Sequence, residues 1–431
     1  MYKVLTVAGS DSGGGAGIQT DLKTFAALGV YGTSVITALT AQNTLGVHGI
    51  HAVPPDFIAC QLEAVLSDIS VHAAKTGMLG DANTISIVAD YLTKYRIRNL
   101  VVDPVMIAQS GQRLLPEDAV DTLRDKLLPL AMVATPNLPE AEILLGKEIS
   151  SVAEMVVAAR EIRRLGPRHV LLKGGHLPGT EMVDIFFDGK DVHTLSENKI
   201  DTINTHGTGC TYAAAITAYL AKGLTPLDAF VRAKKFITDA ITHGICVGSG
   251  YGPTNPIGAI FKELELGNIS RELAKAVSLM QKAKPVANLI VAGQTNLFYC
   301  QEGAGSLAEI ISYPAPLLLC HQQILAVGEP TFDCRLFPAE YLLAAHKKNT
   351  RIRAMINLRH TPEIVSAIKT IEAIGYQTST QNTSTSILAA APEVLILEDT
   401  PDKEPQLILF AETVEEVAEK TVALARHFCG C

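Results

Sequence analysis

Short apolar runs rich in β-branched residues alternate with stretches of helical periodicity from the N-terminus to about residue 260. The helix-period stretches predict helices at Asp56–Ser67, Thr84–Tyr95, Glu117–Leu128 and Ser151–Leu165. The apolar runs predict buried strands at Val4–Ala8, Gly32–Leu39, Leu100–Asp103, Met132–Thr135 and His169–Lys173. Strands that alternate with helices indicate right-handed βαβ units. We therefore expect an α/β fold with a mostly parallel sheet and helices on both faces.

A turn-rich stretch, Tyr251–Gly258, ends this alternation. We expect a polar helix at Ala259–Leu266, followed by Gly267 and Asn268, and a domain boundary near residues 263–270. The chain is thus predicted to contain a first domain of residues 1–262 and a second, smaller α/β domain of residues 270–431. The strands expected in the second domain are Leu289–Ala292, Pro316–Leu319, Ile324–Val327 and Leu407–Phe410, and its helices are Ser270–Ala283, Pro338–Lys347, Pro362–Ile374 and Val414–His427.

Composition narrows the class of protein. Of the 431 residues, 48% are hydrophobic and 19% are charged, so the chain can bury sizeable cores and wholesale disorder is excluded. The net charge of −8 disfavours non-specific binding to nucleic acid or to an anionic membrane. Charged residues interrupt every apolar run before the roughly 18 residues that a membrane span needs. The N-terminus runs directly into a strand, and the eight cysteines form no Cys-x-x-Cys pair, so we expect a cytoplasmic protein with free thiols.

The segment Asn204–Cys210, with the sequence NTHGTGC, opens directly onto a predicted helix. The free N–H groups and the positive dipole end of that helix form an anion site, which glycines allow phosphate oxygens to approach. Cys210 lies at this terminus, where the pKa of a thiol tends to fall. A proton acceptor beside a phosphate cradle is what phosphoryl transfer to an alcohol requires. The alternative is an ordinary helix cap with a buried cysteine.

A glycine-rich loop, Ala8–Asp21, follows the first predicted strand. The loop lacks the Lys-Ser/Thr of a P-loop and does not fit G-x-G-x-x-G in register, so neither motif implies nucleotide binding. Its glycines instead allow a ligand ring to lie close to the backbone, and Asp21 would accept a hydrogen bond from an amino group. A tight strand-to-helix turn with a solvated Asp21 explains the segment equally well.

Charged residues also follow predicted strands at their carboxyl ends, where ligand sites form in parallel sheets. Asp103 ends one strand, and Glu140 enters a helix just after the next. Two carboxylates at adjacent strand ends suit Mg²⁺ that is held through waters and nucleotide phosphates. Lys173 would supply positive charge to a phosphate. Each residue also has a simpler explanation, since a glutamate favours any helix N-terminus and a lone lysine is usually solvated.

Together these segments resemble the hydroxymethylpyrimidine/phosphomethylpyrimidine kinases of thiamine biosynthesis, a branch of the ribokinase-like superfamily. The resemblance covers residues 1 to about 262 and is carried in order by AGSDSGGGAGIQTDLKTF, VITALTAQNT, KTGMLG, TPNLPEAEIL, LLKGGH and NTHGTGC. It implies a ribokinase-like fold and ATP-dependent phosphorylation of an aminopyrimidine alcohol, and then of its monophosphate. It also implies Mg²⁺ as a cofactor and a homodimer.

The same resemblance implies roles for single residues. Gln42 and Asp21 would bind the aminopyrimidine, in a pocket lined by Gly9, Met78 and Val105. The amide of Gln42 follows a predicted strand end, where it can donate to a ring nitrogen and accept from an amino group. The other implied roles are proton acceptor for Cys210, anion hole for Gly207, Thr208 and Gly209, Mg²⁺ ligands for Asp103 and Glu140, and nucleotide contacts for Lys173, Thr208 and Lys234.

The second domain resembles the archaeal-type thiamine-phosphate synthase domain, which joins the pyrimidine diphosphate to thiazole phosphate. Arg353–Val365 and Ala326–Phe332 carry this resemblance. Where that family has Pro-Gly-Arg, this chain has Pro314–Leu317, and where it has Ser-Arg-His, this chain has Cys334–Leu336. Stabilising a diphosphate leaving group needs fixed positive charge. We therefore expect a ligand-binding or dimerising module that makes little or no thiamine phosphate, and a working synthase is the alternative. Arg335, Arg353, Arg359 and His360 remain to hold a phosphate, although ordinary surface charge explains these four residues equally well.

Two alternatives stay open at this point. A pyridoxal kinase shares the fold and phosphorylates a hydroxymethyl group on an aromatic ring, and the second domain would then sense a metabolite. The whole chain could instead be a non-catalytic sensor, although the intact kinase motifs argue against this for the first domain.

Overall fold

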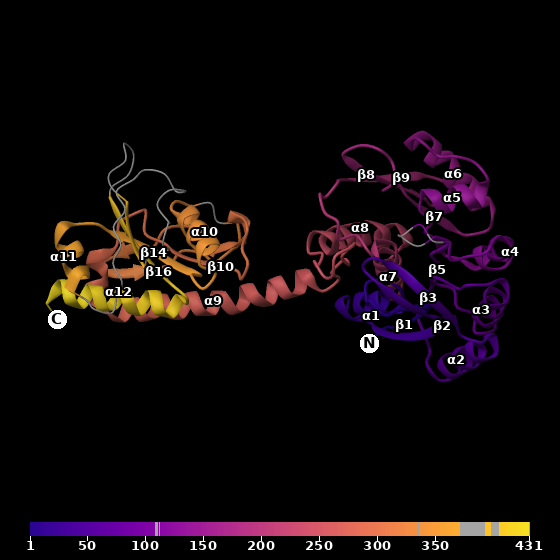
Figure 1. Cartoon of the computed structure of the whole chain (residues 1–431), viewed down its shortest axis with the longest axis horizontal. Helices are drawn as coiled ribbons and strands as arrows, with labels where there is room; N and C mark the ends of the chain where they lie inside the picture. Colours follow the sequence, from indigo (N-terminus) through magenta and orange to yellow (C-terminus); the bar gives the residue numbers. More distant parts are fainter. Residues whose placement is uncertain (108–110, 112, 334–335, 371–392, 398–404, 431) are drawn as a thin grey trace. The chain divides into compact units, whose positions relative to one another are not determined.

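The computed structural model describes residues 1–107, 111, 113–333, 336–370, 393–397 and 405–430 (Figure 1). It divides into two compact units, Met1–Phe261 and Lys262–Cys431. No helix among the described residues is long and apolar enough to span a membrane.

The first unit is built on one sheet with the strand order β3-β2-β1-β4-β5-β6-β7-β8-β9. The strands from β2 to β7 run parallel to their neighbours, and β3, β8 and β9 add antiparallel edges. The predicted mostly parallel α/β sheet is confirmed. The strands are β1 (Lys3–Asp11), β2 (Tyr31–Asn43), β3 (Gly46–Ala52), β4 (Ala73–Thr76), β5 (Leu100–Val102), β6 (Val133–Ala134), β7 (His169–Lys173), β8 (Glu181–Phe187) and β9 (Val192–Asn198).

Helices cover both faces of this sheet, because successive strand residues point to opposite sides. Val101 of β5 packs against α7 and α8, whereas Val102 packs against the side formed by α2 and α3. Asp81, Ser151 and Thr225 cap α3, α6 and α8 by accepting a hydrogen bond from a backbone N–H three residues on. The helices are α1 (Gly17–Ala27), α2 (Pro55–Asp68), α3 (Ala82–Lys94), α4 (Glu117–Thr122), α5 (Leu138–Leu145), α6 (Val152–Arg164), α7 (Thr208–Ala221) and α8 (Pro226–Thr242).

Two details of the first unit differ from the sequence-based expectation. The helix expected at Glu117–Leu128 is α-helical only to Thr122; a π-helical turn and then a 3₁₀ turn that contains Pro129 complete it. The sequence pattern also missed β4, because Lys75 interrupts its apolar run. It missed the exposed edge strands β3 and β9, and it missed β8, which lies between β7 and β9.

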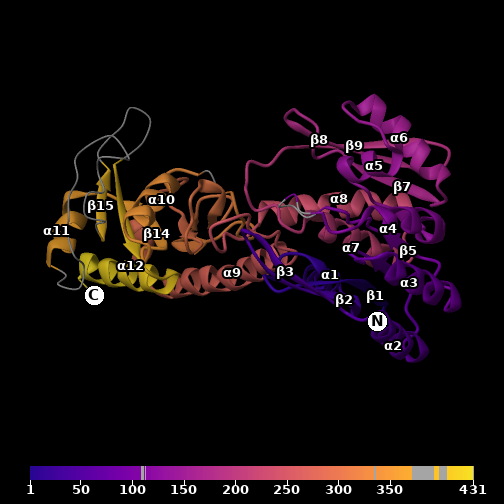
Figure 2. The same cartoon turned by 45° about the vertical axis from the view of Figure 1, so that its right-hand side comes forward.

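The second unit is built on an antiparallel sheet with the order β11-β10-β14-β16-β15 and a separate β12–β13 hairpin. Residues such as Leu409 face α12 and α9, which lie side by side in Figures 1 and 2, while Phe410 faces α10. The elements are α9 (Gly258–Lys282), β10 (Leu297–Cys300), β11 (Ile310–Ser312), β12 (Leu318–Cys320), β13 (Gln323–Leu325), α10 (Ala339–Lys348), β14 (Ala354–Arg359), α11 (Pro362–Thr370), β15 (Val394–Leu397), β16 (Gln406–Ala411) and α12 (Val414–Cys429).

Two expectations for the second unit are wrong. The strand at Leu289–Ala292 is absent, because a 3₁₀ turn over Lys284–Leu289 leads into irregular backbone there. The helix break at Gly267 and Asn268 is also absent, since α9 runs through both residues. Buried Ile269 and Leu273 anchor this part of α9 in the core, and that packing outweighs the cost of about 1 kcal/mol for a glycine inside a helix. Residues 371–374 of the helix expected at Pro362–Ile374 lie outside the described residues.

Each unit contains hydrophobic clusters of its own, so truncating the core of one should leave the other folded. Phe410→Ala removes a fully buried ring from the second unit and should cost about 3–5 kcal/mol there. In calorimetry we expect the transition of the second unit to move down in temperature while that of the first stays in place. Phe57→Ala, at an exposed phenylalanine of α2, is the matched control and should move neither. A common shift of both transitions would show that the two units unfold as one.

Candidate active site

The carboxyl ends of β5 and β7 place two opposite charges together. Asp103 follows β5 and is 2% exposed, and Lys173 ends β7. The Nζ of Lys173 lies 2.9 Å from Oδ1 of Asp103, which also accepts a hydrogen bond from the Thr135 hydroxyl at 3.0 Å. Burial would lower the pKa of Lys173, but the charges of Asp103 and Glu140 raise it above its ordinary value. Lys173 is therefore a fixed cation.

Glu140 joins this pair from the first turn of α5. It forms a capping box with Asn137, whose backbone N–H donates to Oε2 of Glu140 at 2.8 Å. Burial raises the pKa of Glu140 to about 7, against the lowering effect of Lys173. Glu140 thus stabilises the N-terminus of α5 and also lies close enough to Asp103 for their charges to interact. Within the described ranges no cluster of three or more His, Cys, Asp or Glu forms a metal cage. Two carboxylates suit Mg²⁺, which takes oxygen ligands and keeps several waters.

The N-terminus of α7 faces these charges. A Cβ atom on Gly209 would lie 3.3 Å from Nζ of Lys173 and 3.8 Å from Oδ2 of Asp103. Gly207 caps the helix with φ +80°, and a Cβ atom there would lie 1.9 Å from the carbonyl oxygen of Gly15, so only glycine fits. Thr208 starts the helix and donates its hydroxyl hydrogen to the Thr205 carbonyl at 2.7 Å. The backbone N–H of Thr208 also donates to the Thr205 carbonyl, at 3.2 Å. The N-terminal turn of α7 has the geometry of an anion site.

Cys210, in the same turn, has a thiol that is harder to ionise than the sequence suggests. The expected fall in its pKa is wrong, because burial raises the pKa to about 11. Lys75 and a hydrogen bond from Gly17 lower it, but Asp21 and Asp103 raise it. Desolvation therefore outweighs the favourable field at the helix terminus.

A buried ion pair lies next to Cys210. Nζ of Lys75 in β4 lies 2.8 and 2.9 Å from the two carboxylate oxygens of Asp21 in α1, and neither side chain is exposed. The Thr6 hydroxyl donates to Asp21 at 2.6 Å. Asp21 is therefore not solvated, because its side chain is buried between Lys75 and Thr6. These contacts favour a role for Asp21 in holding Lys75, a residue that the sequence-based reasoning missed. A lysine inside a buried strand was the available signal.

The residues expected around a ring come from the glycine loop and its neighbours. A Cβ atom on Gly9 would lie 2.5 Å from Cε of Met78, so the two residues are in contact. Gly17, with φ +56°, starts α1 so close to Gly9 that a Cβ atom would lie 2.3 Å from the Gly9 carbonyl oxygen. Val105 follows Asp103, and its N–H donates to the carbonyl of that residue at 2.9 Å.

Gln42 lies at a β-bulge where the register between β2 and β3 shifts. Bulges re-aim side chains and are common beside active sites. The side chain of Gln42 lies 3.2 Å from Nε2 of His206, which in turn lies 3.0 Å from Oδ2 of Asp11. Gln42 is thereby connected to the residue that precedes Gly207.

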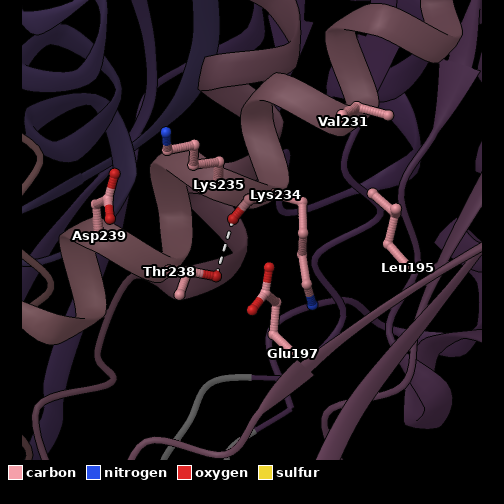
Figure 3. Close-up of a pocket in the computed structure, with 7 residues that line it drawn as sticks. All are labelled: Leu195, Glu197, Val231, Lys234, Lys235, Thr238 and Asp239. Atoms are coloured by element: carbon pink, nitrogen blue, oxygen red, sulfur yellow. Dashed lines mark hydrogen bonds between the residues drawn. The ribbon is translucent and has the colours of Figure 1, made fainter.

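Lys234 lies on α8 beside a hollow of about 370 Å³ (Figure 3). Its Nζ lies 2.8 Å from Oδ2 of Asp184, and the other carboxylate oxygen accepts the backbone N–H of Gly174 at 3.1 Å. Lys234 is thus linked to the residue that follows Lys173. The hollow is lined by Leu195, Glu197, Val231, Lys234, Lys235, Thr238 and Asp239.

Comparison with known proteins finds two family matches. Residues 11–255 match the phosphomethylpyrimidine kinase family, and residues 272–423 match the thiamine-phosphate synthase ThiN family. A thiamine biosynthesis bifunctional protein ThiED of Geobacter sulfurreducens is 58% identical over 59% of this chain and 52% of its own length. The chain therefore spans about half of that relative. A hydroxymethylpyrimidine/phosphomethylpyrimidine kinase of Bacillus subtilis is 48% identical over 59% of this chain and 94% of its own length.

Solved structures of two kinds of vitamin kinase share the fold of the first unit. An ADP complex of Bacillus subtilis pyridoxal kinase is 40% identical and covers 60% of this chain and 99% of its own, with a TM-score of 0.58. A phosphomethylpyrimidine kinase from Clostridium difficile is 46% identical and covers 56% of this chain and 100% of its own, with a TM-score of 0.51.

The raised pKa of Cys210 predicts slow alkylation at neutral pH, because only the thiolate reacts. At pH 7.5 we expect iodoacetamide to modify exposed Cys60 and Cys246 well before Cys210. The rate at Cys210, followed by peptide mass spectrometry with Cys210→Ser as the control, should keep rising towards pH 11. Preferential labelling of Cys210 at neutral pH would contradict the raised pKa.

Proposed function

The chain belongs to the phosphomethylpyrimidine kinase family, and on that premise we propose that it phosphorylates 4-amino-5-hydroxymethyl-2-methylpyrimidine with ATP, and then phosphorylates the monophosphate to the diphosphate. One observation carries the proposal. The N-terminus of α7, with its glycines and Cys210, faces the Asp103–Lys173 pair at the strand ends. An anion site, a proton acceptor and fixed charges are what phosphoryl transfer to an alcohol needs.

In this mechanism the hydroxymethyl oxygen attacks the γ-phosphorus, its proton passes to Sγ of Cys210, and ADP leaves. The N–H groups of Gly207, Thr208 and Gly209 hold the oxygens of the transferring group. A thiol with a pKa of about 11 is mostly protonated at neutral pH, so the thiolate that takes the proton is a minor form. The positive charge of Lys75 favours that form, because it lowers the pKa of Cys210.

The nucleotide side of the reaction uses the charges at the strand ends. We assign Mg²⁺ to Asp103 and Glu140, where the metal would neutralise phosphate charge. Lys173 and Thr208 face the phosphates. The hollow beside Lys234 suits the base and ribose of ATP, because it combines apolar Leu195 and Val231 with polar groups (Figure 3).

Pyridoxal is the second candidate acceptor, because pyridoxal kinase structures at 37–40% identity share the fold of the first unit. The identity of 46–58% to pyrimidine kinases and to the bifunctional relative favours the pyrimidine.

We assign the kinase to residues 1–262 and the synthase-like module to residues 270–431. The module would bind phosphates of the thiamine pathway without rapid synthase turnover. Leu317, at the position expected for an arginine, is fully buried. Arg353 stacks on the Tyr299 ring and lies 3.8 Å from Glu265, while Arg359 donates to the Ile290 carbonyl. Cys334 and Arg335 lie outside the described residues. As the family resemblance implies, we also propose a cytoplasmic homodimer whose partners are small-molecule substrates.

Cys210→Ala should lower kcat for the aminopyrimidine alcohol by roughly 10²-fold or more, the usual scale for losing a general base. Nucleotide binding, measured by calorimetry, should survive because ATP does not depend on the thiol. Cys60→Ala is the matched control and should keep wild-type turnover, since Cys60 is an exposed cysteine of α2. Near-wild-type kcat for Cys210→Ala would show that the thiol is only a packing group. Better turnover of pyridoxal than of the aminopyrimidine alcohol by the wild-type protein would favour the second candidate.

The second unit should form little or no thiamine phosphate when the full chain is given the pyrimidine diphosphate and thiazole phosphate. Several negative charges develop as pyrophosphate leaves, and Arg353 and Arg359 are already engaged within the fold. A thermal shift with thiamine phosphate but no turnover would support a binding role. Rapid product formation would refute it.

A further inference from the structure

Asp11, at the end of β1, holds the glycine loop in place. Its carboxylate accepts the backbone N–H groups of Gly13 at 2.8 Å, Gly15 at 3.1 Å and Ala16 at 2.8 Å. Burial alone would raise the pKa of Asp11, but the hydrogen bonds from His206 and from the loop outweigh it and hold the pKa below its usual value. Asp11 is therefore an ionised carboxylate at neutral pH, and it can only accept hydrogen bonds.

This charge fixes a hydrogen on His206. Because Nε2 of His206 lies 3.0 Å from Oδ2 of Asp11, that nitrogen must carry a hydrogen and donate it. The same Nε2 lies 3.2 Å from the side-chain nitrogen of Gln42, which is itself only a donor. The nitrogen and oxygen of a carboxamide have nearly the same shape, so the hydrogen-bond network decides their assignment. With its oxygen facing His206, Gln42 can share the Nε2 hydrogen with Asp11 as a second acceptor, whereas its nitrogen would place two donors against each other.

The contacts of Thr40 independently indicate the same orientation of the Gln42 amide. Its hydroxyl oxygen lies 3.0 Å from the carbonyl of Ser10 and 3.2 Å from the amide oxygen of Gln42. A hydroxyl has one hydrogen, and the shorter contact assigns it to Ser10, which leaves the oxygen of Thr40 as an acceptor towards Gln42. With the amide of Gln42 turned over, Thr40 donates to Ser10 and accepts from the nitrogen of Gln42. Both neighbours of Gln42 thus require the same orientation.

We propose that His206 and Asp11 are positioning residues for substrate recognition, which hold the amide of Gln42 with its oxygen towards His206 and its nitrogen towards Thr40. The amide then keeps one N–H and one lone pair for a ligand, which fit a ring nitrogen beside an amino group. The inference rests on the proposed function, in which Gln42 contacts the pyrimidine. It adds the direction of that contact: the amino group lies on the His206 side of the amide.

The backbone locks His206 in this position before any ligand arrives. Its N–H donates to the Gly252 carbonyl at 3.0 Å, and its own carbonyl accepts from Thr254 at 3.0 Å. The ring packs so closely on the glycine loop that a Cβ atom on Gly15 would lie 2.4 Å from Cδ2 of His206. A preorganised donor of this kind selects between ligands without a cost of reorganisation on binding.

The test uses two substrates of nearly equal shape, the aminopyrimidine alcohol and its 4-oxo analogue, whose ring N–H and carbonyl reverse the polarity of the edge. Full-length wild type should prefer the amino substrate by roughly 10²-fold in kcat/KM, because a site built to hydrogen-bond one edge rejects the other. In His206→Ala only Thr40 still orients the amide, so this preference should fall at least about tenfold. His206→Gln keeps an N–H donor and should restore the preference. His193→Ala, at a histidine 3.3 Å from Asp188, is the matched control and should leave the preference unchanged.

The ratio of kcat/KM for the two substrates separates a change in substrate recognition from a general loss of activity. A purely structural role for His206 would slow both substrates equally and leave the preference unchanged, and that result overturns the proposal. A tautomer-sensitive ¹H–¹⁵N spectrum of the wild-type histidines provides a second test without turnover: His206 should carry hydrogen on Nε2 at pH 7.5, and a bare Nε2 would also overturn the proposal. If wild type phosphorylates neither substrate, the proposed function fails, while the spectrum still decides the orientation of Gln42.

Discussion

The contact between Gly207 and the carbonyl oxygen of Gly15 is the constraint on which the site depends. No side chain larger than hydrogen fits there, since a Cβ atom on Gly207 would lie 1.9 Å from that oxygen. The contact brings the loop after β1 against the first turn of α7, although about 190 residues separate them in the sequence. In the proposed function, one half of the junction would supply the wall of the ring pocket and the other the N–H groups for the phosphoryl group. The contact would then hold the two halves together before either ligand arrives.

Buried charges set the electrostatics beneath that junction. Removing one partner of a buried ion pair leaves an uncompensated charge, so Asp21–Lys75 and Asp103–Lys173 each persist as units. The two pairs are neutral overall, and Glu140, with a pKa of about 7, is only partly ionised at neutral pH. A bound divalent cation would favour the ionised form of Glu140. The site can thus adjust its charge through Glu140 while the two pairs stay fixed.

Much of this arrangement was predictable from the sequence, for identifiable physical reasons. The apolar run of β1 and the helical periodicity of α6 can be recognised from the local sequence alone. The positions of Asp103, Glu140 and Lys173 after predicted strands indicated that these three residues would converge. Sequence reasoning failed where tertiary contacts decide the outcome. Nothing local indicates that Lys75 has a buried partner, that α9 continues through Gly267, or that burial would reverse the expected shift in the pKa of Cys210. Single-residue roles in the site remain predictions.

The two units differ in how their positive charges are held, and this difference bears on what each can do. In the first unit Lys173 of β7 is paired with Asp103, and Lys75 of β4 is paired with Asp21 of α1, so both charges are held in place before a phosphate arrives. In the second unit two arginines are used within the fold: Arg353, just before β14, packs on Tyr299, and Arg359 of β14 donates to a backbone carbonyl. A guanidinium group that is already engaged within the fold can still attract an anion. It contributes little to a transition state in which new charge develops. This difference supports the kinase role proposed for the first unit and the binding role proposed for the second.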